Sequence, residues 1–282
     1  MQTSMRRAQN PYGGPVTTQT DPATLTDLLR LAVQRDGARP FITYYDDATG
    51  ERTELSLTTF QNWVAKTSNY LRDELDLGSG SAVGVALPLH WLTAVWLSAC
   101  WSVGAVPVID PADDEVLDAA VIGPRRVEHD HGLLPMANDV VAVSLAPLAA
   151  SFGRLGVALP DGVRDYTDEV RVHGDQFDAS ALPSPDDPAL CVMDRTWTHN
   201  ELVHAVTALT TRFGIDQHAR LMTTQGLDGL DPIDAILAAF VTPLVVDGSV
   251  VMCVNADPSG LTERADAEHV TAWAQPPSVP AP

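Results

Sequence analysis

The stretch Ser81–Ile109, SAVGVALPLHWLTAVWLSACWSVGAVPVI, decides the fold because it contains no Lys, Arg, Asp or Glu. A helix that spans a membrane needs about 20 unbroken apolar residues. Pro88 interrupts this stretch near its start, and Gly104 and Pro107 interrupt it near its end. The flanking charges are acidic, whereas a membrane anchor has basic flanks. The stretch is therefore predicted to form three elements buried on both faces: strand 83–87, helix 89–103 and strand 106–109.

Helical and strand patterns alternate on both sides of this stretch. Apolar residues at helical spacing predict amphipathic helices at 24–36 and 58–75, and the polar turn Asp46–Gly50 predicts a hairpin between them. This alternation predicts an α/β fold with a mostly parallel sheet flanked by helices. The remaining predicted elements are strands 118–123, 140–143, 190–193, 221–223 and 249–254, and helices 198–213, 232–240 and 259–269.

The predicted domain organisation has three parts. Residues 1–20 are expected to be a disordered leader, 21–256 an α/β domain, and 257–282 a short helix with a Pro-rich tail. Within the domain, residues 144–186 are rich in Gly, Pro and Asp and show little periodicity. The sequence LPSPDDP at 182–188 is the clearest signal of an internal boundary.

Composition excludes several kinds of partner. The chain has 17 Lys and Arg against 37 Asp and Glu, giving a net charge of −20. Nucleic acid and anionic membranes are therefore not expected partners, because binding their phosphates needs clustered cations. The 3 cysteines are far apart and form no CxxC pair, so neither a disulfide framework nor a zinc site is predicted. No secretory signal follows the first arginines, and a cytoplasmic location fits best.

Most side chains that could carry chemistry have a simpler structural interpretation. Lys66, the single lysine of the chain, falls off the apolar face of its helix and is expected to be a solvated amine. His90 precedes the buried helix and is expected to be a hydrogen-bonded residue at its start. His199 and His204 are five positions apart and do not share a helix face for metal binding.

Three short segments are candidate ligand sites. The cluster Glu128–His131 does not have the spacing of a known metal motif and is expected to be a solvated loop. Gly78–Ser81 is expected to be a turn before a strand. Gly226–Gly229 is expected to be a flexible loop at the carboxyl end of the sheet, where it could contact a ligand. No nucleophile elbow, phosphate loop or dinucleotide fingerprint is present in the sequence, so no catalytic, cofactor-binding or metal-binding residue is predicted.

Two segments carry a resemblance to a known family. They are ARPFITYYDDATGERTELSLTTFQNWVAKTSNYL at 38–71 and SAVGVALPLHWLTAVWLSACWSVGAVPVIDP at 81–111. Their order and spacing resemble the opening of the adenylate-forming superfamily, which includes acyl-CoA synthetases and the adenylation domains of peptide synthetases. The resemblance implies the N-terminal subdomain of that fold in a truncated form. Fainter similarities continue at Asp186–Met193, Thr198–Val203, Ala235–Pro243, Gly248–Cys253 and Val270–Trp273.

The resemblance breaks where the family binds ATP. Between the segments similar to 186–193 and 198–203, the family has a Ser/Thr/Gly-rich loop ending in Pro-Lys-Gly, which holds the phosphates. This chain has only Asp194-Arg195-Thr196-Trp197 there, and Asp194 would add a negative charge. The family's adenine and ribose motifs, its catalytic lysine and its C-terminal domain correspond to positions beyond 282. The departure implies that the chain does not make acyl adenylates.

Three functional interpretations follow from this comparison. The first is a non-catalytic homologue that acts in binding or regulation, without a cofactor. The second is a subunit of a split adenylate-forming ligase, or a weak binder of nucleotides or acyl groups. The third is a fragment without function. In full-length relatives a second subdomain packs against this one. The corresponding face is therefore expected to be covered by a protein partner, by a second copy in a homo-oligomer, or by the chain's own Gly/Pro-rich segment 144–186.

Overall fold

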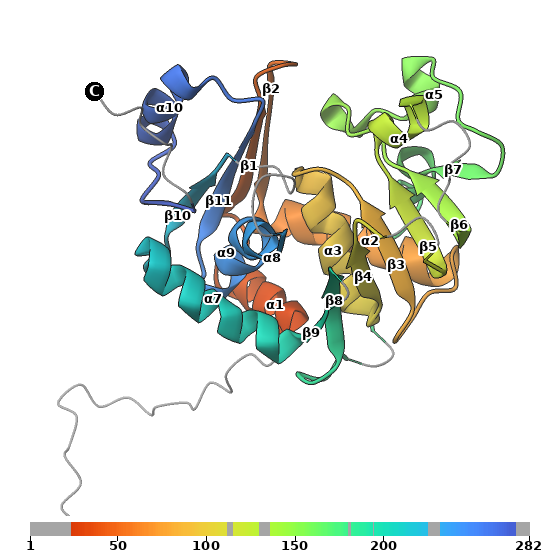
Figure 1. Ribbon diagram of the computed structural model, residues 1–282, viewed down its shortest axis with the longest axis horizontal. Coiled ribbons are helices and arrows are strands. Elements are labelled where there is room, and N and C mark those ends of the chain that lie inside the picture. Colours follow the sequence, from red (N-terminus) through yellow and green to blue (C-terminus); the bar gives the residue numbers. More distant parts are fainter. Residues whose placement is uncertain are drawn as a thin grey trace, which may run out of the picture.

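A computed structural model describes residues 24–111, 115–129, 136–179, 182–193, 195–224 and 232–274. Its strands form two sheets with helices between and around them, as Figure 1 shows. The predicted α/β class is confirmed, with the strands divided between two mostly parallel sheets. Some predicted segments lie outside the described residues: the leader at 1–20, the loop at 226–229 and the tail after 274.

The first sheet, sheet A, is built around the predicted hairpin. It consists of β1 (Pro40–Asp46), β2 (Glu51–Ser56), β10 (Arg220–Thr223), β11 (Ser249–Val254) and β12 (Ala272–Trp273). The strand order is β12-β10-β11-β1-β2, and β2 is the antiparallel strand. Asp46 pairs with Glu51 at the end of the hairpin. Gly50 closes the turn with a φ of 75°, a backbone conformation that glycine adopts at little cost.

The second sheet, sheet B, contains the predicted β-α-β unit. It consists of β3 (Ala82–Ala86), β4 (Val106–Ile109), β5 (Leu117–Ile122), β6 (Ala137–Ala142), β7 (Val163–Asp165), β8 (Pro188–Val192) and β9 (Arg195–Thr198). The order is β7-β6-β5-β3-β4-β8-β9, and all neighbours are parallel except β8 and β9. The edge strands β7 and β9 were not predicted, because each is too short to show a periodic pattern.

The longer helices lie where the sequence predicts helices, whereas the short helices at 124–129, 152–155 and 166–170 were not predicted. The longer ones are α1 (Leu25–Asp36), α2 (Leu57–Asp73), α3 (Trp91–Val103) and α7 (His199–Phe213). The shorter ones are α4 (Pro124–His129), α5 (Phe152–Leu155), α6 (Tyr166–Val170), α8 (Pro232–Ile236), α9 (Thr242–Val245) and α10 (Leu261–Ala267). Two 3₁₀ turns, η1 (Pro147–Ala149) and η3 (Pro258–Gly260), and a π-helical turn, η2 (Leu237–Val241), complete them.

The predicted helix at 232–240 continues further than expected. The structure runs from α8 through the π-helical turn η2 into α9, which ends at Val245. Pro243 lies in the first turn of α9, where a missing N–H costs little. The wider π turn before it accommodates the proline ring without ending the helix.

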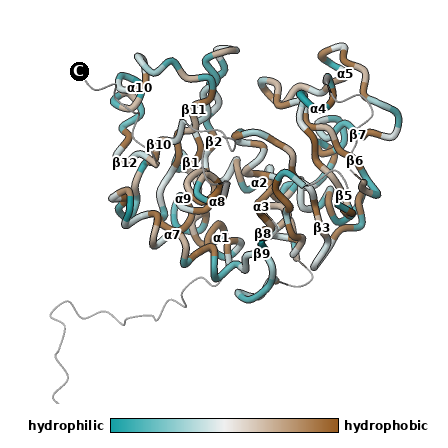
Figure 2. Tube along the Cα trace, in the orientation of Figure 1, coloured by the Kyte–Doolittle hydropathy of each residue, from teal (hydrophilic) through white to brown (hydrophobic). Residues whose placement is uncertain are grey.

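Helix α3 lies between the two sheets, and all of its residues are buried. It contacts β1 of sheet A and β4 of sheet B, and Figure 2 shows hydrophobic colouring in this central region. His90 caps its start, and Gly104 ends it with a φ of 79°. The prediction of a buried β-α-β unit is thereby confirmed. Over the part of the chain that the structure describes, no helix has the length and apolarity needed to cross a membrane.

The segment 144–186 is more regular than its sequence indicates. It contains α5, β7 and α6, and β7 extends sheet B beside β6. Tyr166 and Phe152, which begin its two α-helices, are both fully buried. These short elements were not predicted, because they are stabilised by contacts with distant residues and not by a local periodic pattern.

Candidate functional site

The connection between β8 and β9 occupies the position where the resemblance places an ATP phosphate loop. Val192 pairs with Arg195 in antiparallel register, so Met193 and Asp194 form the whole connection. Met193 has a φ of 49° and is exposed. The guanidinium of Arg195 lies 3.5 Å from the ring centroid of Trp197. A phosphate loop surrounds its ligand with many backbone N–H groups, and a connection of two residues provides few of them.

The helix that follows this connection is capped by its own side chains. The Thr198 hydroxyl accepts a hydrogen bond from the Glu201 N–H at 3.2 Å. In return, the Glu201 carboxylate accepts one from the Thr198 N–H at 2.9 Å, forming a capping box. Glu201 thus places a negative charge at the end of α7 that would otherwise favour an anion. The local chemistry at β8, β9 and α7 is unfavourable for a triphosphate.

The buried histidines have structural roles, as predicted. His90 Nδ1 accepts a hydrogen bond from the Leu92 N–H at 3.0 Å, and burial lowers the pKa of His90 to about 3. His199 Nδ1 accepts from the Leu25 N–H at 3.4 Å, and burial lowers the pKa of His199 to about 4. His204 is exposed on α7 whereas His199 is buried. The two therefore occupy different environments and do not form a metal site.

The other candidate segments form no ligand-binding site within the described residues. Gly78–Ser81 forms a turn, in which the Ser81 N–H donates to the Gly78 carbonyl at 3.1 Å, as predicted. Of the cluster Glu128–His131, the last two residues lie outside the described ranges. Within those ranges, no group of three or more His, Cys, Asp or Glu side chains could hold a metal ion.

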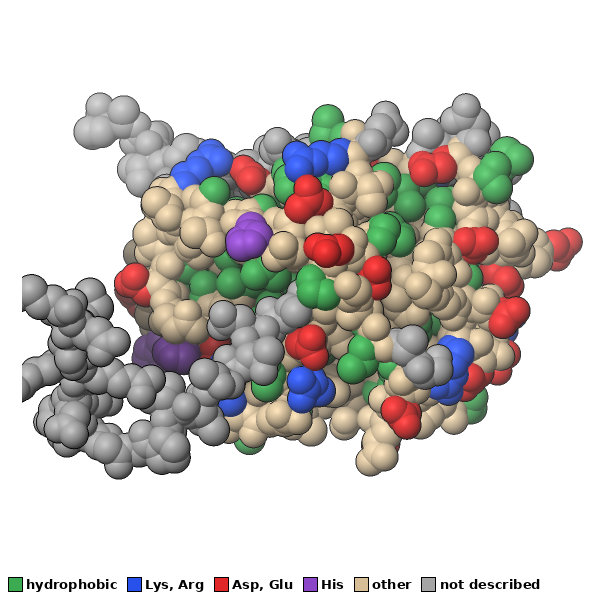
Figure 3. All heavy atoms as spheres, turned by 90° about the horizontal axis from the view of Figure 1, so that it is seen from below, with side chains coloured by type: hydrophobic (Ala, Val, Ile, Leu, Met, Phe, Trp, Pro, Cys, Tyr) green, Lys and Arg blue, Asp and Glu red, His purple; other side chains and the backbone are tan. Residues whose placement is uncertain are grey.

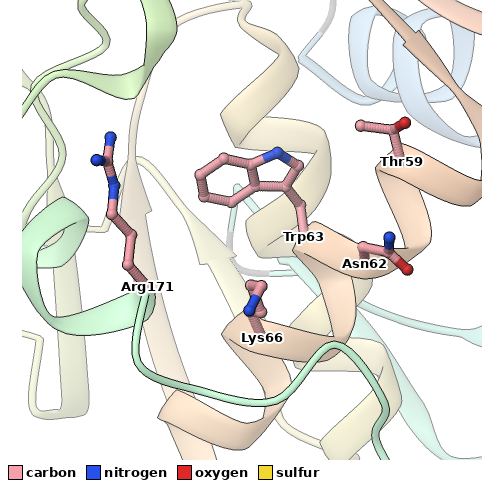
Figure 4. A pocket seen from close by; sticks show the side chains of 5 residues that line it. All are labelled: Thr59, Asn62, Trp63, Lys66 and Arg171. Atoms are coloured by element: carbon pink, nitrogen blue, oxygen red, sulfur yellow. The ribbon is translucent and has the colours of Figure 1, made fainter.

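One face of α2 lines a cavity of about 300 Å³. Thr59, Asn62, Trp63 and Lys66 recur at the spacing of one helix face, and Arg171 faces them from the segment that follows α6. Figure 4 shows the Trp63 ring extending from α2 towards the Arg171 side, with Lys66 about one turn further along the helix. This pocket brings two cations and one aromatic ring together.

Hydrogen bonds from α2 fix the segment that carries Arg171. The Thr67 and Tyr166 hydroxyls are 2.7 Å apart, and the Tyr70 hydroxyl donates to Glu169 Oε2 at 2.8 Å. Asn69 Nδ2 donates to the carbonyl oxygens of Gly174 and Gln176 at 3.0 and 2.9 Å. The segment is thus held on both sides of Arg171, which lines the pocket together with Lys66.

Backbone carbonyls, and not carboxylates, hold the two cations of the pocket. Lys66 Nζ donates to the His173 carbonyl at 2.5 Å, and Arg171 Nη2 donates to the Ala149 carbonyl at 2.7 Å. Neither cation forms an ion pair within the described ranges, although most arginines there do. Lys66 is half-buried, so the expectation of a freely solvated amine is wrong.

A stack of aromatic side chains supports the inner wall of the pocket. Trp63 meets Trp91 edge-on, with ring centroids 5.4 Å apart, and Trp91 lies 5.5 Å from the His90 ring. The His90 ring in turn packs against Tyr44 of sheet A, with ring centroids 4.5 Å apart. The buried Trp91 Nε1 and His90 Nε2 have no hydrogen-bond partner among the described residues. This stack connects the half-buried Trp63 to the core and limits its freedom to move.

Sequence reasoning did not identify this pocket. Thr59, Asn62 and Lys66 form a polar stripe beside the apolar face of α2, and this stripe was the available signal. The partners of α2 come from distant residues, since the carbonyl that accepts from Lys66 lies 107 positions later. On the face of the molecule shown in Figure 3, acidic side chains are scattered and basic ones lie in a few small groups.

Comparison with known proteins supports the fold. No protein-family model matches the chain. The chain is 37% identical over 257 residues to a TIGR03089 family protein of Mycobacterium tuberculosis (strain ATCC 25618 / H37Rv), covering 89% of this chain and 98% of that protein.

Solved structures of acyl-CoA synthetases share the fold. The N-terminal domain of FACL13 from Mycobacterium tuberculosis superposes with a TM-score of 0.64 at 13% identity, covering 88% of this chain and 61% of that one. Brucella canis acyl-CoA synthetase gives a TM-score of 0.68 at 13% identity over 87% of this chain and 46% of that one. The anthranilate CoA ligase AuaEII gives 0.60 at 14% identity, over 81% and 44%. The chain therefore spans about half the length of these structures, and the predicted resemblance to their N-terminal domain is confirmed.

Proposed function

The chain belongs to the TIGR03089 family, and from this membership and its fold we propose that it is a non-catalytic homologue of the adenylate-forming enzymes that acts by binding. The observation that carries the proposal is the two-residue connection between β8 and β9. An adenylating enzyme must stabilise the negative charge that develops on the α-phosphate of ATP during attack by a carboxylate. Met193 and Asp194 replace the loop that would do so.

The surroundings of this connection support the same proposal. Arg195 is the nearest cation in the sequence, but its guanidinium lies on Trp197 and forms an ion pair with Glu201 at 3.7 Å. In the capping box of α7, the Thr198 and Glu201 side chains accept hydrogen bonds from backbone N–H groups at the helix N-terminus, so these groups are not free for a phosphate. A fold that keeps its core while its phosphate-binding region becomes a tight hairpin is consistent with binding and not with phosphate chemistry.

Exchange of labelled pyrophosphate into ATP tests this proposal. The purified chain is assayed with Mg-ATP and a mixture of carboxylic acids, beside an active acyl-CoA synthetase of the same fold as a positive control. We expect no exchange above the protein-free blank. In parallel, calorimetric titration with Mg-ATP should give a Kd weaker than about 1 mM. Carboxylate-dependent exchange would contradict the proposal and show that a phosphate site exists elsewhere in the chain.

A further inference from the structure

We propose that the pocket between α2 and the segment after α6 binds a small organic oxyanion, with its anionic group between Lys66 and Arg171 and its flat apolar part against Trp63. This inference rests on the proposed binding function and names the site and the class of ligand. The site is distinct from the region that would bind ATP. Arg171 follows α6 at the β7 edge of sheet B, whereas the two-residue connection lies at the opposite edge, beside β9.

Charge is the first reason for an anionic ligand. The chain has a net charge of −20, and most arginines in the described ranges are neutralised by carboxylates. Lys66 and Arg171 line one cavity and, among the described residues, their hydrogen-bond partners are backbone carbonyls. Lys66 is half-buried, and a half-buried cation without a counter-ion loses hydration without gaining an opposite charge. An anion bound between the two would supply that charge to both cations.

Both cations have donors left for a ligand. A lysine ammonium has three N–H groups and an arginine guanidinium has five. Within the described ranges, Lys66 gives one hydrogen bond, to the His173 carbonyl, and Arg171 donates from Nη2 to the carbonyls of Leu148 and Ala149. The remaining donors can bind carboxylate or phosphate oxygens through charge-assisted hydrogen bonds. Thr59 and Asn62 add neutral polar groups to the same cavity.

Apolar surface beside the cations selects an organic ligand over a simple inorganic anion. Trp63 is half-buried and faces the cavity, and its contact with Trp91 holds its ring in place. Leu148, whose carbonyl is 3.4 Å from Arg171 Nη2, has a side chain that is 91% exposed, and Val172 next to Arg171 is 82% exposed. Both are exposed apolar residues next to Arg171, although neither lines the cavity itself.

The size of the cavity limits the ligand. A volume of about 300 Å³ is at the lower end of pockets that enclose small molecules, which have volumes of about 300–1,000 Å³. One or two fused rings with a single anionic group fit this limit. The anionic group of the ligand can be a carboxylate or a phosphate, and the experiment below distinguishes the two.

Calorimetric titration with three matched probes tests the proposal. 1-Naphthoate carries a carboxylate, 1-naphthyl phosphate carries a phosphate, and 1-naphthamide is the neutral counterpart of the first. We expect at least one anion to bind with a Kd below about 1 mM, and the neutral amide to bind at least about tenfold more weakly because it lacks the charge. The tighter of the two anions identifies the preferred head group. Affinity should fall as NaCl is raised, since salt screens the charges.

Variants locate the binding. Lys66→Gln and Arg171→Gln should each weaken binding of the preferred anion by about tenfold or more, whereas Lys66→Arg should retain it. Arg154→Gln is the matched control, because Arg154 is also exposed and has no ion pair in the described part of the chain, but does not line the cavity. Circular dichroism confirms that each variant is folded.

Three outcomes would overturn the proposal: no binding of either anion at millimolar concentration, equal binding of the neutral amide, or an equal loss of affinity in Arg154→Gln. None of these affects the pyrophosphate exchange assay, so the pocket can fail while the proposed non-catalytic function holds. Conversely, exchange activity would refute the non-catalytic function whether or not 1-naphthoate binds.

Discussion

The indole Nε1 of Trp101 donates a hydrogen bond of 2.6 Å to the carbonyl oxygen of Ala189, which joins the buried helix α3 to strand β8. The two residues are 88 positions apart in the chain, and both are buried. The bond therefore connects the centre of the molecule to the strand that precedes the two-residue connection.

Replacing Trp101 by Phe should destabilise the protein strongly. The change leaves the Ala189 carbonyl without the indole donor and removes buried ring volume, at a combined cost of about 3 kcal/mol in the free energy of unfolding. Urea unfolding followed by circular dichroism measures it. Trp273→Phe is the control, because Trp273 is half-buried on the edge strand β12. This substitution should lower the free energy of unfolding by less than about 1 kcal/mol. Equal losses in the two variants would contradict this role of Trp101.

Stability should fall as the solution becomes moderately acidic. Burial lowers the pKa of His90 to about 3 and that of His199 to about 4, whereas an unfolded histidine titrates near about 6.5. Below that pH the unfolded chain takes up protons that the folded protein does not. The free energy of unfolding should therefore fall between about pH 6.5 and pH 4, by up to about 1.4 kcal/mol per pH unit for each histidine.

His90→Asn tests the share of this pH dependence that comes from one residue. Asparagine is a good helix N-cap but does not titrate, so the variant should lose stability less steeply than the parent as the pH falls from about 6.5 to 4. His204→Asn changes an exposed histidine of α7 and should keep the slope of the parent. A His90→Asn slope that matches the parent would show that His90 titrates normally in the folded protein.

Gly248→Ala should be poorly tolerated. A Cβ at Gly248 would lie 2.2 Å from the backbone oxygen of Ala219, and a backbone atom in a strand connection cannot move aside cheaply. We expect a loss of about 2 kcal/mol or more, seen as a decrease in Tm of about 5 °C. Gly260→Ala is the matched control, since no atom lies within 4 Å of a Cβ there, and its Tm should be almost unchanged.

Met193→Asn should stabilise the connection between β8 and β9. Met193 has a φ of 49°, in the left-handed region that asparagine tolerates better than most residues. Its side chain is 74% exposed, so its removal loses little burial. We expect a gain of about 0.5–1 kcal/mol in the free energy of unfolding. Met193→Ala keeps the unfavourable conformation and should give no such gain.

The elements that follow from local sequence were predictable. Pro88 follows the end of β3 and Gly104 ends α3, as the sequence predicts, whereas Pro107 lies within β4. The predicted helix at 198–213 likewise agrees with α7. By contrast, β7 and β9 are short edge strands whose stability comes from neighbours distant in the chain, and α6 depends on hydrogen bonds from α2.

The candidate pocket could be predicted only in part, because one of its sides depends on residues that are distant in the sequence. Its α2 side is a regular polar stripe, but Arg171 enters from a segment with no periodic pattern of its own. The absence of a phosphate loop, in contrast, was evident in the sequence, because the two flanking segments are locally recognisable. The expected domain boundaries and the expected partner or second copy stay predictions.

A helix that is apolar on every side has no surface to present to water, and this has a consequence for how the chain folds. Helix α3 lies between the two sheets, so separation of either sheet would expose one of its faces. Unfolding of one sheet alone therefore costs almost as much free energy as complete unfolding. We expect the two sheets to fold and unfold together, as a single cooperative unit. In such an architecture the central helix, not a covalent linker, determines that the two sheets form one domain.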